Sequence, residues 1–589
     1  MRALYRSFIL VMVAVLGYQC QREISIDNLD PVNNNPNPIT ANLQGNVVDE
    51  NGLPVASARV KIGNETIMTN ARGYFRLNKA PLDKQASVVT VEKSGYFKAY
   101  RSFSATSGTN QVMVKLVPKT LAGTIASSTG GEVSLSNGSK ISLPANGVTL
   151  ASGDAYSGEV RVFAAYIDPT AEDIAQTVPG SFMADDKDNK RVTLGSYGML
   201  AVELESPSGQ KLQVRQGSKA TLDAPIPSSL QASAPSTIAL WYVDETTGIW
   251  KEEGQATKQG NRYVGEVSHF SFWNYDISIP AVTLSLALRN QEGGPLVHAH
   301  VRISRIGPGV VGTAHGITDS LGQVSGFVPS NENLLLEVLN PCNAAVYSQN
   351  LNPLTQNTNL GSITVAANPS FLVTLKGRLV NCAGNAVSNG LAIVEYDNVI
   401  RYAQANSTGN FSLSLLRCGT SPSTVQVIGV DEGSSQQGNI ATINLTPGIT
   451  DAGDLAACGV TVSEFITYTL DGTVYNHTSA TDSIMKGSSI PDSTLTGQLV
   501  TYITASGSSN QFIQLVFKSA SPAAGTYAAQ LVSFTNYFNN TIVPPFNIVL
   551  TSFPQNIAQF YEGSFSGQFR DAQNVVHTVT NGSFKLRRN

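Results

Sequence analysis

Apolar and polar residues alternate along most of this chain, in short runs that end at glycine, proline or asparagine. Ala58, Val60 and Ile62 stand between polar neighbours, and residues 467–470 and 563–569 repeat the alternation. A period of two places successive side chains on opposite faces of a strand, so each run predicts a strand with one face toward a core. No run with a helical period of useful length occurs. The pattern therefore predicts an all-β fold.

The 589 residues predict several domains rather than one core, because a domain holds roughly 100 to 200 residues. We expect a multidomain array of Ig-like β-sandwiches, each with two sheets around its own core. The expected segments are a signal peptide (1–19), an asparagine- and proline-rich tether (20–40), a first sandwich (41–118), a tryptophan-containing β domain (119–279), a second sandwich (280–366), a third sandwich with cysteines (367–460) and a C-terminal β module (461–589).

Three segments share an order of strand, glycine turn and strand, followed by a second glycine turn. Residues 45–55 read G-x-V-x-D-x-x-G-x-P-V, and residues 69–75 read T-x-x-x-G-x-F. Looser copies begin at Leu286 and Leu375. The first copy resembles the carboxypeptidase regulatory-like domain, a transthyretin-like β-sandwich, and the other two resemble it less closely. The resemblance implies non-catalytic accessory or spacer modules, which are frequent in surface and secreted proteins.

Two further stretches carry resemblances of their own. Residues 120–276 hold all three tryptophans and are similar to an extracellular region of cartilage intermediate layer proteins. That resemblance implies core or hairpin positions for the tryptophans and brings no chemistry with it. Residues 465–589 resemble the C-terminal β modules of Gram-negative surface lipoproteins.

The first twenty residues predict export. Arg2 and Arg6 precede an apolar run, 8–17, that would cover about 15 Å at roughly 1.5 Å per residue, half of a bilayer's hydrocarbon core. This length is typical of a signal peptide. Cleavage after Gly17 would release a secreted chain, and cleavage two residues later, before Cys20, is the alternative.

The later cleavage predicts a lipid anchor at Cys20. Residues 16–20 resemble a lipoprotein signal, in which the cysteine becomes the lipidated first residue, although Gln19 stands where a small residue is usual. No other run reaches 18 apolar residues, so we expect membrane attachment through Cys20 alone. The expected location is the cell envelope, as an outer-membrane lipoprotein on its surface or periplasmic face. The protein is secreted if Cys20 is not lipidated.

The other four cysteines predict two disulfides. Cys342, Cys382, Cys418 and Cys458 are even in number, as expected in an oxidising compartment, and no C-x-x-C pair suggests zinc. If strand directions alternate, Cys382 and Cys458 lie at one end of the third sandwich. Cys418 then lies at the other end, near Cys342 of the preceding sandwich. The pairs 382–458 and 342–418 follow.

Charge and motif content argue against nucleic-acid binding and catalysis. Lysine and arginine number 38 and aspartate and glutamate 42, only 14% of the chain, so no broad basic surface is available for a phosphate backbone. No histidine begins an H-x-x-E or H-E-x-x-H motif, and G-x-S-x-G is missing. We expect no catalytic residue, no metal site and no cofactor. A catalytic triad assembled from distant loops remains an alternative, because triads are recognised by geometry and not by sequence position.

Three local patterns carry weak signals for ligands. Residues 307–312 read G-x-G-x-x-G but lead into a strand, so we expect a hairpin in place of a nucleotide site. His298 and His300, with His315 near in sequence, align with positions of the first copy on the strand face opposite its core, and we expect exposed histidines. Residues 185–189 are acidic but lack the pattern of a calcium loop, which predicts a solvated hairpin tip.

The combined pattern predicts a non-catalytic surface stalk with an adhesive or ligand-binding role toward glycan or protein. Modules strung end to end would reach roughly 100 Å or more. One alternative is an accessory subunit of a nutrient-uptake system that binds glycan on aromatic rings. Its stacking candidates are Trp241, Tyr242, Trp250 and Trp273, although core positions are favoured for the tryptophans. The other alternative is a secreted hydrolase with a cryptic site.

Overall fold

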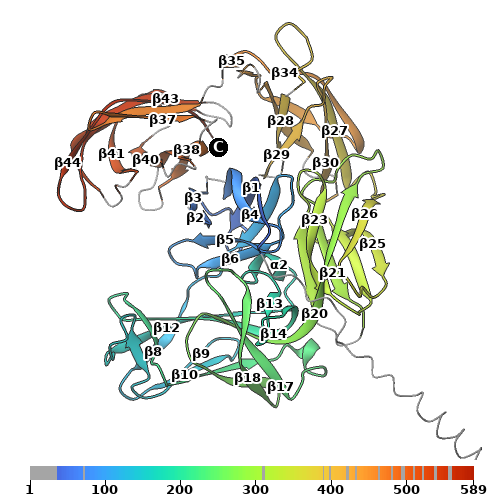
Figure 1. The fold of residues 1–589 in the computed structure, drawn as a ribbon, viewed down its shortest axis with the longest axis vertical. Coiled ribbons are helices and arrows are strands. Elements are labelled where there is room, and N and C mark those ends of the chain that lie inside the picture. The colour runs from blue at the N-terminus through green and yellow to red at the C-terminus, as the bar shows by residue number, and fades with distance from the viewer. Residues whose placement is uncertain are drawn as a thin grey trace, which may run out of the picture.

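Nearly every element of the protein is a β-strand (Figure 1). The computed structural model describes residues 36–588, apart from gaps at 57, 70–72, 308–311, 389, 397–398, 420–422, 432–433, 435, 462–463, 479–481, 493–497, 508–510, 521–522, 536, 538–539 and 555–559. The helical elements of this part are the four-residue helix α2 (Ile174–Thr177) and the short 3₁₀ helix η2 (Ser228–Leu230). The all-β prediction is confirmed. Within the same residues, no helix has the length and apolar character needed to cross a membrane.

The chain is first described just before strand β1 (Pro38–Val48). The predicted signal peptide, Cys20 and most of the predicted tether lie outside the described residues. Residues 38–40 pair with the end of β4 (Tyr74–Asp83), and Ile39 packs against the first core. The tether prediction is therefore wrong for these three residues, because an apolar side chain among them has a core to join.

The first module is a sandwich of two sheets. One sheet has the order β4-β1-β7 (Asn110–Lys115), and the other has the order β3 (Glu65–Met68), β2 (Arg59–Ile62), β5 (Ser87–Glu92) and β6 (Ala99–Phe103). Val60 and Ile62 point inward from β2, and Leu43 and Val47 meet them from β1. The period-two pattern thus places one face of each strand in a shared core.

The second and third modules repeat this arrangement. In each, the central strand is antiparallel to one neighbour and parallel to the other, as β1 is. The second module places β20 (Phe272–Arg289) between β23 (Gln323–Pro329) and β26 (Thr358–Thr364), against β22 (Thr313–Ile317), β21 (His300–Arg305), β24 (Leu334–Leu339) and β25 (Ala345–Leu351). The third places β27 (Leu372–Val380) between β30 (Asn410–Leu416) and β34 (Gly448–Ala456), against β29 (Val399–Gln404), β28 (Gly390–Tyr396), β31 (Thr424–Asp431), β32 (Gln436–Gln437), β33 (Ala441–Asn444) and β35 (Val460–Thr461).

One turn glycine recurs in the three modules for a steric reason. Gly73, Gly322 and Gly409 have φ angles of 66°, 73° and 79°. A Cβ added to them would lie 2.2, 2.5 and 2.7 Å from a carbonyl oxygen of the central strand. Only glycine tolerates both the positive φ and this close approach. The repeated glycine in the sequence therefore marks one repeated backbone contact.

The tryptophan-containing domain shares a strand with the second module. Its strands follow the order β11 (Val148–Leu150), β15 (Lys211–Val214), β14 (Arg191–Glu205), β20, β17 (Thr237–Val243), β18 (Trp250–Gln259), β19 (Arg262–Val267), β16 (Ala220–Pro225), β10 (Lys140–Leu143) and β9 (Gly131–Ser134), with β8 (Leu121–Ala126), β12 (Glu159–Ile167) and β13 (Met183–Asp185) beside this path. The first half of β20 pairs with β14 and β17, and its second half pairs with β23 and β26. The predicted boundary at 279/280 thus lies inside a continuous strand.

The C-terminal module is one nine-stranded antiparallel sheet around one core. Its order is β37 (Thr473–Thr478), β36 (Phe465–Leu470), β44 (Val576–Arg587), β43 (Phe560–Arg570), β42 (Thr541–Ser552), β41 (Gly525–Phe534), β40 (Phe512–Ser519), β39 (Leu499–Gly507) and β38 (Asp482–Pro491). A bridge between Gly487 and Arg588 joins β38 to the residue after β44. The sheet therefore curls on itself, which differs from the expected pair of separate sheets.

The first module lies at the centre of the molecule, and the other modules surround it (Figure 1). Each neighbour makes a direct contact with it: Ser102 Oγ donates to Gly248 O, Gly108 N–H donates to Asp319 Oδ2, the Arg76 guanidinium lies over the Tyr402 ring, and Lys486 Nζ donates to Met68 O. The modules are therefore not strung end to end, and the expected extended arrangement is wrong. The neighbouring modules therefore cover parts of the outer faces of the first module, whereas Arg59 and Lys61 of β2 stay exposed.

Two disulfides connect the four cysteines in the predicted pairs, Cys342 with Cys418 and Cys382 with Cys458. Cys382 and Cys458 each follow one of the parallel neighbours β27 and β34, so this bridge closes the third module on itself. The other bridge joins the residues after β24 and β30, and it ties the second module to the third.

Candidate binding cavity between three modules

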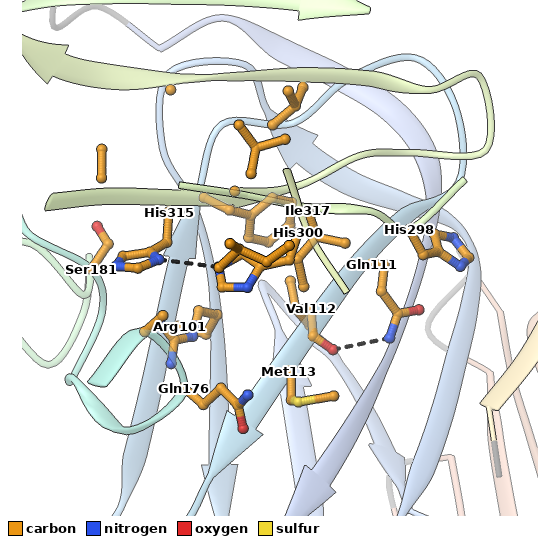
Figure 2. A pocket seen from close by; sticks show the side chains of 18 of the residues that line it. Arg101, Gln111, Val112, Met113, Gln176, Ser181, His298, His300, His315 and Ile317 are labelled. Atoms are coloured by element: carbon orange, nitrogen blue, oxygen red, sulfur yellow. Dashed lines mark hydrogen bonds between the residues drawn. The ribbon is translucent and has the colours of Figure 1, made fainter. Parts of the chain in front are cut away.

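A cavity of about 520 Å³ lies where the first module, the tryptophan-containing domain and the second module meet. One wall comes from β6 and β7, a second from α2 and residues 181–183, and a third from β21 and β22 (Figure 2). This volume lies within the range of small-molecule sites, roughly 300–1,000 Å³. The cavity is therefore the candidate binding site.

Arg101 extends from β6 into the cavity and is only 9% exposed. Its Nη1 donates to Gly180 O at 3.2 Å, whereas Nε and Nη2 have no hydrogen-bond partner among the described residues. None of the described lining residues is aspartate or glutamate. Burial lowers the pKa of Arg101 to about 10, so the guanidinium stays charged at neutral pH. A buried cation without an anion is costly, which makes this position a candidate for anion binding.

Two histidines of the second module form a hydrogen-bonded pair beside Arg101 (Figure 2). His300 Nε2 lies 3.1 Å from His315 Nδ1. Burial, and then the charges of Arg302 and Arg101, lowers the pKa of His300 to about 4. Burial, followed by His300 and the same two arginines, lowers the pKa of His315 to about 3. Both imidazoles are therefore neutral at pH 7, and Arg101 carries the charge at this end of the cavity.

The prediction of solvent-exposed histidines is wrong. His300 does lie on the strand face opposite the core residue Val301, as the alignment indicated, but the first module covers that face. His298 precedes β21 with a φ of 54° and also lines the cavity. Burial, and then the charge of Arg401, lowers the pKa of His298 to about 3.

Gln111 provides a second buried polar group, on the side of the cavity toward His298 (Figure 2). Its Nε2 donates to Asn46 Oδ1 at 3.2 Å, and its Oε1 has no partner in the part of the chain that is described. The side chain is 8% exposed. An unpaired buried acceptor, like the unpaired donors of Arg101, costs free energy that a polar ligand atom bonded to it would recover.

The remaining lining is apolar and continues between the two sheets of the second module. Leu284 and Leu286 contribute from β20, Val301 and Ile303 from β21, and Val328 from β23. Gly326 on β23 also lines the cavity, and no heavy atom lies within 4 Å of the position that a Cβ would take there. The core of this module is therefore incompletely filled, in contrast to ordinary close packing. His300 and His315 line the polar part from the outer face of β21 and β22, and the apolar part lies on the inner face of the same strands. The two parts of the site therefore connect around the edge strand β22.

Main-chain hydrogen bonds between modules hold the walls in place. Ser102 N–H donates to Gly180 O at 3.0 Å, and Gly180 N–H donates to Tyr100 O at 2.8 Å. On the other side, Thr109 N–H donates to Ser320 Oγ at 2.8 Å, and Ser320 N–H donates to Thr109 O at 3.1 Å. The distance between Arg101 and the histidine pair is thus set by backbone contacts, which favours a preformed site.

The tryptophan residues do not form a glycan platform. Trp241, Trp250 and Trp273 are completely buried, and each indole N–H donates to a backbone carbonyl. A sugar ring cannot stack on a buried indole, so the favoured core assignment is confirmed and these stacking candidates are excluded. Tyr242 is partly exposed but packs against His269 and Trp273.

The other weak patterns do not form ligand sites either. Asp185 is buried and pairs with Arg191 Nε and Lys251 Nζ, both at 2.6 Å, so its carboxylate is occupied by cations of the chain itself. Residues 307–312, of which 308–311 lie outside the described part, lead into strand β22 as predicted. No group of three or more histidine, cysteine, aspartate or glutamate side chains among the described residues is arranged to hold a metal ion.

Arg101 and Gln111 were not identified from the sequence. An arginine between Tyr100 and Ser102 in an alternating strand predicts a solvent-facing side chain. The histidines were the available signal, since they are uncommon in this chain, which has six. They could not locate the arginine, because it comes from a different module.

Comparisons with known proteins show limited similarity. No family model matches the chain, so the resemblance to carboxypeptidase regulatory-like domains has no support there. Mouse cartilage intermediate layer protein 2 is 26% identical over 232 residues, which is 37% of this chain and 20% of that protein. Human cartilage intermediate layer protein 1 is 26% identical over 230 residues, which is 36% of this chain and 19% of that protein. The match thus spans about a fifth of the length of these relatives.

Solved structures give weaker matches. The shaft pilin SpaA from Lactobacillus rhamnosus GG has a TM-score of 0.16 at 11% identity, covering 31% of this chain and 99% of the pilin. The major pilin subunit BcpA of Bacillus cereus has a TM-score of 0.12 at 8% identity, covering 70% and 99%. The Bacillus anthracis TIE protein has a TM-score of 0.14 at 10% identity, covering 65% and 70%. This protein is therefore an all-β, multidomain chain that is similar to cartilage intermediate layer proteins over about a third of its length.

Proposed function

We propose that this protein is a non-catalytic binding protein of the cell envelope that holds a small molecule in the cavity between three of its modules. The observation that carries the proposal is the buried guanidinium of Arg101, a residue of the cavity lining. Its Nε and Nη2 have no hydrogen-bond partner among the described residues, and the described lining contains no acidic residue. The central position of the first module favours binding over an extended spacer role. No reaction is proposed.

A cavity-filling variant tests the binding function. Gly326→Phe adds a ring where the structure has open space, so it should block the apolar end without a backbone clash, and Gly326→Ala is the matched control. We expect that a library of neutral, anionic and cationic small molecules contains compounds that raise the unfolding temperature of the native protein and of Gly326→Ala, but not of Gly326→Phe. If every stabilising compound acts equally on Gly326→Phe, the cavity is not the binding site.

The envelope location is tested separately. We expect the native protein to fractionate with the outer membrane and to be lipidated at Cys20, and the Cys20→Ala variant to be released into the periplasm or medium. Proteinase treatment of intact cells then reports which face of the membrane carries the protein. A native protein that is as soluble as Cys20→Ala would overturn the lipid anchor.

A further inference from the structure

We propose that the cavity binds an organic carboxylate with an apolar body, with the carboxylate against Arg101 and the apolar body between the sheets of the second module. This inference rests on the binding function proposed above and adds the chemical class of the ligand. It follows from the free edge of the guanidinium, from the charge of its surroundings and from the unfilled apolar end.

The free donors of Arg101 fit a carboxylate. Its Nη1 already donates to Gly180 O, which leaves Nε and Nη2 as the pair without a hydrogen-bond partner among the described residues. These two N–H groups lie along one edge of a planar guanidinium and point in nearly the same direction. Two carboxylate oxygens can accept from such an edge in a bidentate arrangement.

The charge of the site fits a monoanion. The His300 and His315 pair beside Arg101 is neutral at pH 7 for the reasons given above. Arg302 is balanced by Glu337, whose Oε2 lies 2.8 Å from its Nη2. Arg401 also lines the cavity, but it acts on His298, on the side of Gln111. Beside the histidine pair, Arg101 thus supplies the positive charge, and a carboxylate neutralises it. A phosphate dianion would leave a buried negative charge, which is costly.

The apolar end requires an apolar ligand group. Leu284, Leu286 and Ile303 line it, and the space over Gly326 is empty. Water is not stabilised in a space lined by such side chains, because the lining offers it few hydrogen-bond partners. Methylene or aromatic carbons placed there would recover contacts that the side chains lack. A small carboxylate such as acetate would leave this end empty.

Matched probes test both ends of the proposed ligand on the native protein. We would titrate decanoate, butyrate, 1-decanol, glucuronate and inorganic phosphate by calorimetry, below the concentrations at which decanoate aggregates. Decanoate should bind at least tenfold more tightly than each of the others. Hydrogen exchange should slow in β6 and β22 when decanoate is bound. Neither measurement depends on a variant that has to fold.

Variants then assign the contacts. Arg101→Gln should weaken decanoate binding at least tenfold, and Arg101→Lys should weaken it less, because a lysine keeps the charge but loses the paired donors. Arg215→Gln removes an exposed arginine of the tryptophan-containing domain and should leave binding unchanged. Gly326→Phe should abolish decanoate binding, and Gly326→Ala should not.

The outcomes separate this inference from the proposed function. If 1-decanol binds as tightly as decanoate, or if Arg101→Gln binds decanoate normally, the carboxylate is not recognised and the inference fails. If butyrate or glucuronate binds as tightly as decanoate, the apolar body is not recognised and the inference also fails. The proposed function survives these results if at least one compound binds the native protein but not the Gly326→Phe variant. It fails if every compound that binds the native protein binds the Gly326→Phe variant equally well.

Discussion

At the scale of single residues, the chemistry of a charged group is decided by what faces it. Arg101 is buried with two unpaired donor groups, whereas Arg191, also buried, donates to Asp185 at 2.6 Å. The first arrangement costs free energy in the absence of a ligand, and the second is compensated. The two arginines therefore differ in what their removal should do.

We predict that Arg101→Met stabilises the ligand-free protein by about 1–3 kcal/mol, because it removes unpaired buried donors. Gly180 O stays satisfied, since Ser102 N–H also donates to it. Arg191→Met should instead destabilise the protein, because Asp185 loses a partner. Denaturant unfolding of both variants checks the prediction. A loss of stability in Arg101→Met would indicate a structural role for this arginine.

Asp276 leads to a pH-dependent prediction. It is completely buried, and one of its oxygens has no hydrogen-bond partner within the described chain. Burial raises the pKa of Asp276 well above its usual range, although a hydrogen bond from Asn274 opposes the shift. The folded state therefore keeps a proton that the unfolded chain releases near pH 4. Stability falls as pH rises above this value, by up to about 1.4 kcal/mol per pH unit, until the pH passes the folded pKa.

The variant Asp276→Asn should remove this dependence. We expect it to raise the free energy of unfolding, relative to the native protein, more at pH 8 than at pH 4.5. Asp188→Asn, at an exposed turn, is the control and should show no such difference. Equal effects of Asp276→Asn at the two pH values would mean that the carboxyl is ionised in the folded protein.

At the scale of elements, strand β20 joins two domains without a linker. Its first half packs in the tryptophan-containing domain, and its second half supplies Val282, Leu284 and Leu286 to the second core. Side chains alternate between the two faces of a strand. A register shift by one residue, or by any odd number, would therefore move these three side chains from the core to the outer face. The register of β20 therefore couples the two domains.

We predict that a one-residue insertion after Pro280 destabilises the second module strongly, because three buried side chains are each worth about 1.5–3 kcal/mol. A two-residue insertion at the same place keeps the alternation and should cost much less. Hydrogen exchange of β21 and β24 measures the stability of this module. Equal protection in the two variants would show that a bulge absorbs the insertion.

The two disulfides act on different elements. Cys382–Cys458 joins the ends of parallel neighbours within the third module, whereas Cys342–Cys418 joins two modules. We predict that replacing Cys382 and Cys458 by alanine lowers the stability of the third module by about 2–4 kcal/mol. Replacing Cys342 and Cys418 should mainly uncouple the second module from the third, seen as two calorimetric transitions in place of one. Identical effects of the two pairs would contradict this assignment.

At the scale of the whole molecule, the C-terminal module docks on the first module through a buried lysine. Lys486 is 3% exposed and donates to Met68 O, and Ser506 donates to Glu65 nearby at 3.3 Å. Burial lowers the pKa of Lys486 to about 7. A detached module would expose the lysine, whose pKa would then be near 10.4. Between these two pKa values, the docked state binds fewer protons than the detached state. Docking therefore strengthens as pH rises from about 7 to about 10.

We predict that the maximum dimension in solution scattering is larger at pH 7 than at pH 9.5 for the native protein. Lys486→Met should remove the difference, because it carries no proton, and Lys219→Met, at an exposed position, should keep it. A maximum dimension that does not change with pH in the native protein would show that the lysine stays buried when it is charged.

The sequence by itself determined the strands, the repeated modules and the disulfide pairs. These depend on local properties: the alternation of apolar residues, a glycine at a turn that no other residue can form, and the direction of strands that end at cysteines. The core positions of the tryptophans followed for the same reason, since an apolar surface of that size is seldom left in water.

Only the tertiary structure decided how the modules pack and what their outer faces do. The alternation shows that His300 and Arg101 point away from their own cores, but it does not say whether water or another module lies beyond. That depends on contacts between residues far apart in the chain, such as Gly108 with Asp319. The candidate site exists only where three such outer faces meet, so no single stretch of sequence contains its pattern.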